Sequence, residues 1–263
     1  MRTIKLTIAY DGTRYAGWQL QPDRPTVQGT IESALEQIVG QRSRVAGSGR
    51  TDAGVHALGQ VASFDTTTSL AADVLRRALN ARLPHDIAIL EAVDAPPGFH
   101  AAADAVRKRY RYMIHDGPIR DVFGRRYCWH VYQRLDAERM HRAAQACIGT
   151  HDFASFENRG SPRESSVRTV FDVAVHRGGG DEANRVVIEV EADGFLYNMV
   201  RNIVGTLVEV GRRARSEAWV GEALAACDRS AAGPTAPAEG LFLLRVEYDL
   251  PDQGDATLVA PAP

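Results

Sequence analysis

The order of its predicted elements constrains this chain more than any other feature of the sequence. Residues 3–10 alternate apolar and polar side chains as a half-buried strand does, and Thr26 precedes an apolar helical stripe that ends at Gly40. The elements that follow are strands at about 43–48, 60–64 and 87–93 and a helix at 71–82. This order, β-α-β-β-α-β, is that of a ferredoxin-like unit.

The second half of the chain repeats this order. Its predicted strands are at 107–115, 127–131, 170–176, 185–192 and 241–248, and its helices begin at Asp136, Phe195 and about 217. We therefore predict an α+β protein in which two ferredoxin-like (βαββαβ) halves, with mainly antiparallel sheets, flank a central active-site cleft. The predicted domains are residues 1–105 and 106–250, followed by a flexible tail over 251–263.

Charge is distributed unevenly along the chain. The net charge of −2 argues weakly against a nucleic-acid partner, yet residues 101–126 contain seven basic side chains and three acidic ones. Phosphate binding requires a local basic surface, not a basic protein. The three cysteines are widely spaced, and there is no run of 18 apolar residues. We expect no disulfide framework, no membrane span and a cytoplasmic location.

One short segment combines the groups that a reactive site needs. Gly49–Ala57 reads GRTDAGVHA, and Gly47 stands two residues before it. Glycines allow positive φ and close approach of another chain, so they can frame a preorganised loop around the carboxylate of Asp52. An Asp beside a Gly is also common in an ordinary hairpin turn, where its side chain bonds to its own backbone.

Two further motifs follow in order, KRYRY at Lys108–Tyr112 and NMVRNIVG at Asn198–Gly205. With GRTDAGVHA they resemble the tRNA pseudouridine synthase A family, whose members convert uridines at positions thirty-eight to forty in the anticodon arm of tRNA. Shorter matching stretches are at 15–19, 99–101, 151–156, 167–169 and 240–243. The resemblance therefore extends over nearly the whole chain.

The resemblance implies roles for individual residues. Asp52 would be the catalytic nucleophile, and Tyr110 would stack on the extruded base; Tyr112 lies on the same strand face, so spacing alone leaves both tyrosines open. Arg201 lies off the apolar stripe of its helix and should have an anionic partner, which the resemblance makes Asp52. Arg50 would help to displace the target base, either by filling its position in the stack or by holding a phosphate.

The remaining candidates are cations that could contact the RNA backbone. Any one of them is more often a solvated surface charge than a phosphate ligand. They are Arg107, Lys108, Arg111, Arg159, Arg163 and Arg168. Family members commonly carry an arginine where this chain has Ala102, which puts one such contact in doubt.

No cofactor is expected, because uridine isomerisation involves no net redox change. His56 stands four residues after Asp52, and Cys128 two before His130, but no third or fourth ligand has metal-site spacing. The resemblance also implies tRNA as the partner and a homodimer as the working form.

Two other classes of function fit parts of the sequence. A non-catalytic tandem RNA-binding protein would share the fold and the basic strand but would not need Asp52 in a glycine-framed loop. A glycosidase would need a second carboxylate as acid or base, and the loop offers no obvious one. Whether Asp52 attacks the ribose C1′ or the uracil C6 also stays open.

Overall fold

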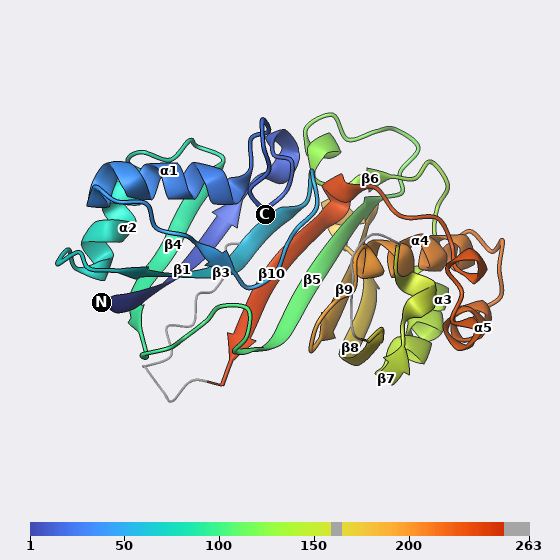
Figure 1. The fold of residues 1–263 in the computed structure, drawn as a ribbon. Coiled ribbons are helices and arrows are strands. Elements are labelled where there is room, and N and C mark those ends of the chain that lie inside the picture. Colours follow the sequence, from blue (N-terminus) through green and yellow to red (C-terminus); the bar gives the residue numbers. More distant parts are fainter. Residues whose placement is uncertain (159–164, 250–263) are drawn as a thin grey trace.

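The computed structural model describes residues 1–158 and 165–249, and its described strands form one continuous sheet (Figure 1). The strand order is β4-β1-β3-β10-β5-β9-β8-β7, with β2 paired to β3 and β6 paired to β5. The strands are β1 (Arg2–Tyr10), β2 (Ala46–Gly47), β3 (His56–Thr66), β4 (Ile87–Ala95), β5 (Ala105–His115), β6 (Trp129–His130), β7 (Gly149–Asp152), β8 (Val167–Arg177), β9 (Arg185–Ala192) and β10 (Leu241–Tyr248).

Most neighbouring strands in this sheet are antiparallel. The exceptions in the described chain are β10 with β3 and β5 with β6, which pair in parallel. The last strand, β10, lies between β3 and β5 and so joins the early and late parts of the chain within one sheet. The fold is therefore α+β with a mostly antiparallel sheet, as the element order predicted.

The helices form two groups at opposite ends of the sheet (Figure 1). They are α1 (Val27–Val39), α2 (Ala72–Asn80), α3 (Ala137–Ala144), α4 (Met199–Gly211) and α5 (Trp219–Ala226). The first two lie beside β4 and β1, and the other three lie beside β7 to β9. The central strands β10 and β5 run between the two groups. In the described part of the chain, no helix is long and apolar enough to cross a bilayer.

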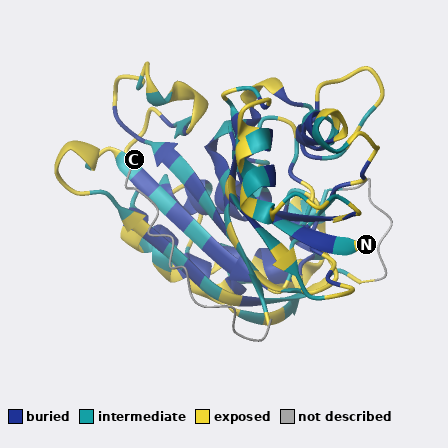
Figure 2. Cartoon of the chain, turned by 90° about the vertical axis from the view of Figure 1, so that its left-hand side faces the viewer, coloured by how far each residue is buried: buried dark blue, intermediate teal, exposed yellow. Residues whose placement is uncertain are grey.

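Alternating side chains build the core, and Figure 2 shows buried segments along the strands and exposed ones in the surrounding loops. Ile4, Leu6 and Ile8 of β1 are fully buried, whereas the residues between them are only partly covered. The predicted cap of α1 is also present. The Thr26 hydroxyl accepts a bond from the Gly29 amide, and Gly40 closes the helix with φ of +74°.

Several local predictions differ from the structure. Helix α4 begins at Met199, not at Phe195, because Asn198 has the left-handed φ of 61°, which interrupts a right-handed helix. The strand expected at 43–48 shortens to β2. Gly149, expected only to end a helix, opens β7 with φ of +111°, and that strand was not predicted.

Candidate active site

The loop that carries Asp52 lies between β2 and β3 and is held by the segment before α1. The Trp18 amide donates to the Thr51 carbonyl at 3.0 Å, and the hydroxyls of Tyr10 and Thr51 bond at 2.8 Å. A Cβ at Gly17, where φ is +99°, would lie 2.5 Å from the Thr51 carbonyl oxygen. A bare backbone is therefore required at Gly17, and the loop is fixed from both its main chain and its side chains.

The three glycines around the loop serve different purposes. Only Gly54 among them has a positive φ, +80°, which supplies the turn after Asp52. Gly47 has none, but a Cβ there would lie 2.5 Å from the Trp18 ring. At Gly49 a Cβ would make only ordinary contacts. The glycine pattern thus combines one turn and one close approach.

Asp52 forms an ion pair with Arg201 across 149 positions of sequence, the Oδ2 and Nη1 atoms being 3.3 Å apart. The guanidinium is fixed on two other sides. Its Nη1 donates to the Asn198 side-chain oxygen at 2.8 Å, and its Nε donates to the Ala236 carbonyl at 2.7 Å. Since Arg201 lies in the first turn of α4, the start of this helix determines where the cation meets the carboxylate.

Burial controls the protonation of both candidate catalytic groups. Desolvation raises the pKa of Asp52 above 3.8, and the Arg201 cation opposes that rise without cancelling it. Burial also raises the pKa of Tyr110 strongly, and the nearby Tyr10 and Asp52 add to this effect. Tyr110 therefore remains a neutral phenol that can donate a hydrogen bond but is poorly suited to work as a phenolate base.

A cavity of about 840 Å³ brings five of the predicted site residues together. The five are Arg50, Asp52, Lys108, Tyr110 and Arg201. The Phe195 ring meets the Tyr110 ring edge to face, with centroids 5.0 Å apart. Tyr112 does not line this cavity; it is fully buried and donates to the Pro237 carbonyl at 2.7 Å. The geometry thus distinguishes two tyrosines that sequence spacing could not.

Of the other predicted phosphate contacts, the three that the structure describes, Arg107, Arg111 and Arg168, do not line this cavity. Arg107 and Arg111 lie on the opposite face of β5, where they pair with Glu191 at 3.5 Å and Glu189 at 2.7 Å. Arg168 is half-buried and close enough to Lys108 for its charge to add to the desolvation that lowers the lysine pKa. Arg159, Arg163 and the 251–263 tail lie outside the described residues.

The side chains considered for metal binding contact backbone carbonyls. The His56 Nε2 is 3.0 Å from the Arg126 oxygen, the Cys128 thiol donates to Gly124, and the His130 ring bonds to Gly117. Across 1–158 and 165–249, no three His, Cys, Asp or Glu side chains group as metal ligands do.

Sequence reasoning missed three contributors to this cavity. Phe195 packs on Tyr110, Asn198 accepts from Arg201, and Arg24 reaches the cavity from the segment before α1. Asn198 stands in the NMVRN motif three residues before Arg201, so the motif contained a usable signal. No sequence signal pointed to the Ala236 carbonyl, because only folding brings it close to Arg201.

The site combines a glycine-framed carboxylate, a partly buried arginine paired with it and an aromatic ring that lines the same cavity. The chain belongs to the tRNA pseudouridine synthase family, whose model matches residues 6–102 and 143–249. It is 50% identical over 250 residues to a protein from Moorella thermoacetica named tRNA pseudouridine synthase A, covering 94% of this chain and 100% of that one. A Brevibacillus brevis protein of the same name is 48% identical, with the same coverage of both chains.

Proposed function

We propose that Asp52 is the nucleophile with which this protein isomerises uridine in the anticodon arm of tRNA. Family membership and the names of its relatives support the broader statement that the chain is an isomerase converting uridine to pseudouridine in tRNA. The assignment of Asp52 as the nucleophile rests on its ion pair with Arg201 inside the 840 Å³ cavity. A carboxylate held ionised in a largely desolvated site is suited to attack carbon.

The reaction breaks the N1–C1′ bond and forms a C5–C1′ bond to the same ribose. The C5 proton leaves and N1 gains a proton, so atoms and electrons balance without a redox partner. An ionised Asp52 can hold either C1′ of the ribose or C6 of the base while the uracil turns. Tyr110 and Phe195 would pack against the base. The Arg201 cation would stabilise the negative charge of Asp52.

Substrate entry requires the uridine to leave its stack, which costs a few kcal/mol. Arg50 is exposed beside the cavity and is placed to occupy the vacated position or to hold a phosphate. We assign the target to positions thirty-eight to forty of the anticodon arm. The assignment rests on the resemblance of the three motifs to the synthase A family.

We also propose that each half of the sheet is one ferredoxin-like unit, residues 1–105 and 106–250. In support, β4-β1-β3 with β2 beyond it and β10-β5-β9-β8 follow the same relative strand order. The boundary between the two units falls where β5 begins. A homodimer in the cytoplasm completes the proposal, on the grounds of the family resemblance alone.

The test is nucleotide-resolution mapping of pseudouridine in a transcribed tRNA after incubation with the purified protein. We expect modification only at positions thirty-eight to forty, and at least about a thousandfold slower formation with Asp52→Asn. The ionised carboxylate costs stability at neutral pH because burial raises its pKa, so the variant should melt no lower than the wild type.

Three results would contradict the proposal. Asp52→Asn turnover within tenfold of the wild type would exclude the nucleophile. Release of free uracil would indicate a glycosidase, and tRNA binding without any modification would indicate a non-catalytic RNA-binding protein.

A further inference from the structure

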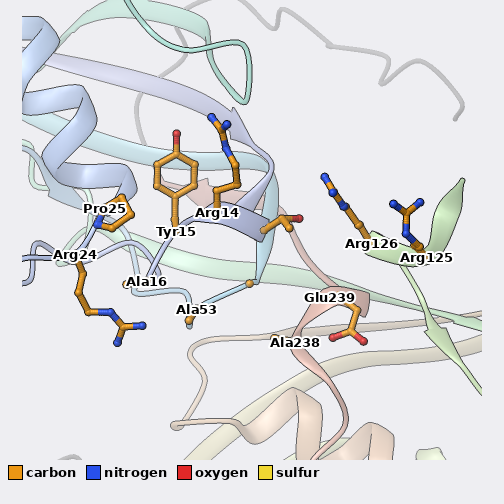
Figure 3. Close-up of a pocket in the computed structure, with 12 residues that line it drawn as sticks. Arg14, Tyr15, Ala16, Arg24, Pro25, Ala53, Arg125, Arg126, Ala238 and Glu239 are labelled. Carbon is orange, nitrogen blue, oxygen red and sulfur yellow. The ribbon is translucent and has the colours of Figure 1, made fainter.

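A second cavity, of about 580 Å³, lies on the other side of the Asp52 loop. Figure 3 shows Arg24 at one end, Arg125 and Arg126 at the other with Glu239 below Arg126, and Arg14 between the two ends. The two walls come from the segment before α1 and from the loop between β5 and β6. We call this space the arginine groove.

The charge of the arginine groove is mostly unpaired. Within the described chain, no carboxylate lies within ion-pair distance of Arg24, Arg125 or Arg126, and all three side chains are exposed. Arg14 pairs with Asp86 at 2.8 Å, although 71% of its side chain remains exposed. Glu239 is the one acidic residue among the lining residues. Such a surplus of guanidinium groups favours a ligand that carries several negative charges.

The two walls of the groove are tied together by hydrogen bonds. The Gly12 amide donates to His56 Nδ1 at 3.1 Å, and His56 Nε2 lies 3.0 Å from the Arg126 carbonyl oxygen. The Asp11 carboxylate also lies 3.2 Å from His56 Nδ1. The Tyr127 hydroxyl donates to Asp11 at 2.9 Å from the same loop. The arginines on the loop are thereby held opposite those on the other wall, which lowers the ordering cost of binding.

The groove continues into the cavity that contains Asp52. Ala16, Arg24 and Ala53 line both spaces. A strand whose target nucleotide occupies the Asp52 cavity would therefore pass Arg24 and enter the groove with its adjoining nucleotides. Arginine is suited to such a strand because its planar guanidinium can bind phosphate oxygens in pairs.

We propose that the arginine groove binds the phosphodiester backbone next to the target nucleotide, through Arg24 on one wall and Arg125 and Arg126 on the other. The inference rests on the proposed function, since it requires the RNA to enter the adjoining cavity. It extends that function to a binding site on residues that the sequence motifs do not include. His56 acts there as a positioning residue, through the bond to the Arg126 carbonyl.

The test is the salt dependence of tRNA binding. The dissociation constant of an end-labelled, transcribed tRNA is measured by fluorescence anisotropy over a range of KCl concentrations. For the double variant R125Q/R126Q we expect the log–log slope to flatten by about 1.4 units and the affinity at 0.15 M salt to fall about tenfold. Arg24→Gln, on the opposite wall, should flatten the slope by about half as much.

The matched control is the double variant R76Q/R77Q, which removes two adjacent cations from α2 at the outer end of the sheet. Equal slope changes in both double variants would overturn the proposal. A changed oligomeric state in sedimentation, with an unchanged slope, would also overturn it and make the groove an interface between copies. If the wild type binds with the expected slope but forms no pseudouridine, the proposed function fails and the groove remains.

Discussion

Both faces of strand β5 contain basic residues, but the surroundings of the two faces differ. On one face Lys108 and Tyr110 line the Asp52 cavity. On the other face Arg107, Arg109 and Arg111 point away from it, because alternate residues of a strand point to opposite sides. The run RKRYRY predicts a basic, aromatic surface for RNA, yet only one of these faces adjoins the candidate site.

Carboxylates from neighbouring strands neutralise the arginine face. Arg109 alone bonds to Asp172, Glu189 and Glu191, at 2.6, 2.7 and 2.9 Å. Arg245 of β10 also pairs with Glu191, at 2.8 Å. This face therefore has little positive charge to offer a phosphate.

Lys108 has different neighbours. Its ammonium donates to the Ser48 carbonyl at 2.7 Å, and no carboxylate of the described chain lies within ion-pair distance. Burial lowers its pKa, and the charge of Arg168 adds to that effect. The comparison teaches that a count of basic residues measures charge, whereas pairing decides how much of it can act on a ligand.

The largest expected effect tests the cavity face through Arg201→Met. Loss of the cation should slow pseudouridine formation at saturating tRNA by about a hundredfold or more, because Asp52 loses its charge partner. Arg201 opposes the burial that raises the Asp52 pKa, so its removal should raise that pKa further and move the acidic limb of the rate profile to higher pH. Single-turnover rates from pH 4 to 8 measure both effects.

A thermal melt of Arg201→Met controls for a folding defect, since Met fills a similar volume. A variant that melts normally and turns over normally would show that the ion pair has no role in the reaction. If the acidic limb of the rate profile stays at the same pH, the ionisation that it reports is not that of Asp52.

A smaller effect is expected from Tyr110. Base–aromatic stacking contributes about 1–3 kcal/mol, so Tyr110→Leu should lower the rate about tenfold to a hundredfold, whereas Tyr110→Phe keeps the ring and should lose less. The same single-turnover assay compares the two. Equal losses for Phe and Leu would assign the role to the hydroxyl and not to the ring.

The next prediction compares the two faces of β5 directly. Lys108→Met should flatten the salt dependence of tRNA binding by about 0.7 units and weaken affinity about fourfold at 0.15 M salt. Arg111→Met removes the same charge from the paired face and should leave the slope unchanged. Anisotropy titrations of both variants decide the matter, and equal slopes would abolish the distinction between the faces.

The smallest effect concerns stability on the arginine face. Burial alone would raise the Glu191 pKa, but hydrogen bonds and charges from Arg109 and Arg245 outweigh it and hold the pKa below 4.5. Stability from this group is therefore complete above pH 4.5 and is lost as pH falls through the lowered pKa. Urea unfolding from pH 3 to 7 should show a flatter pH dependence for Glu191→Gln. An unchanged pH dependence would mean that Glu191 contributes nothing through its charge.

Several parts of the fold could be predicted because their causes lie close together in sequence. Alternation identified β1, the cap at Thr26 and the glycine at Gly40 bounded α1, and β10 was predicted with its observed bounds. The start of α4 could not be predicted in this way, because the apolar pattern extends back to Phe195 while Asn198 adopts a left-handed conformation. Local signals identify an element better than they locate its ends.

The sequence by itself determined the order of the elements, the three motifs and the family to which they point, since each depends on neighbouring residues. Only the tertiary structure decided which residues meet. It set β10 between β3 and β5, brought Arg201 to Asp52, and paired Arg111 with a glutamate while leaving Lys108 beside the cavity. The physical reason is that pairing, burial and electrostatic interaction depend on distance in space. In addition, a shift of one residue along a strand moves a charged side chain to the opposite face of the sheet.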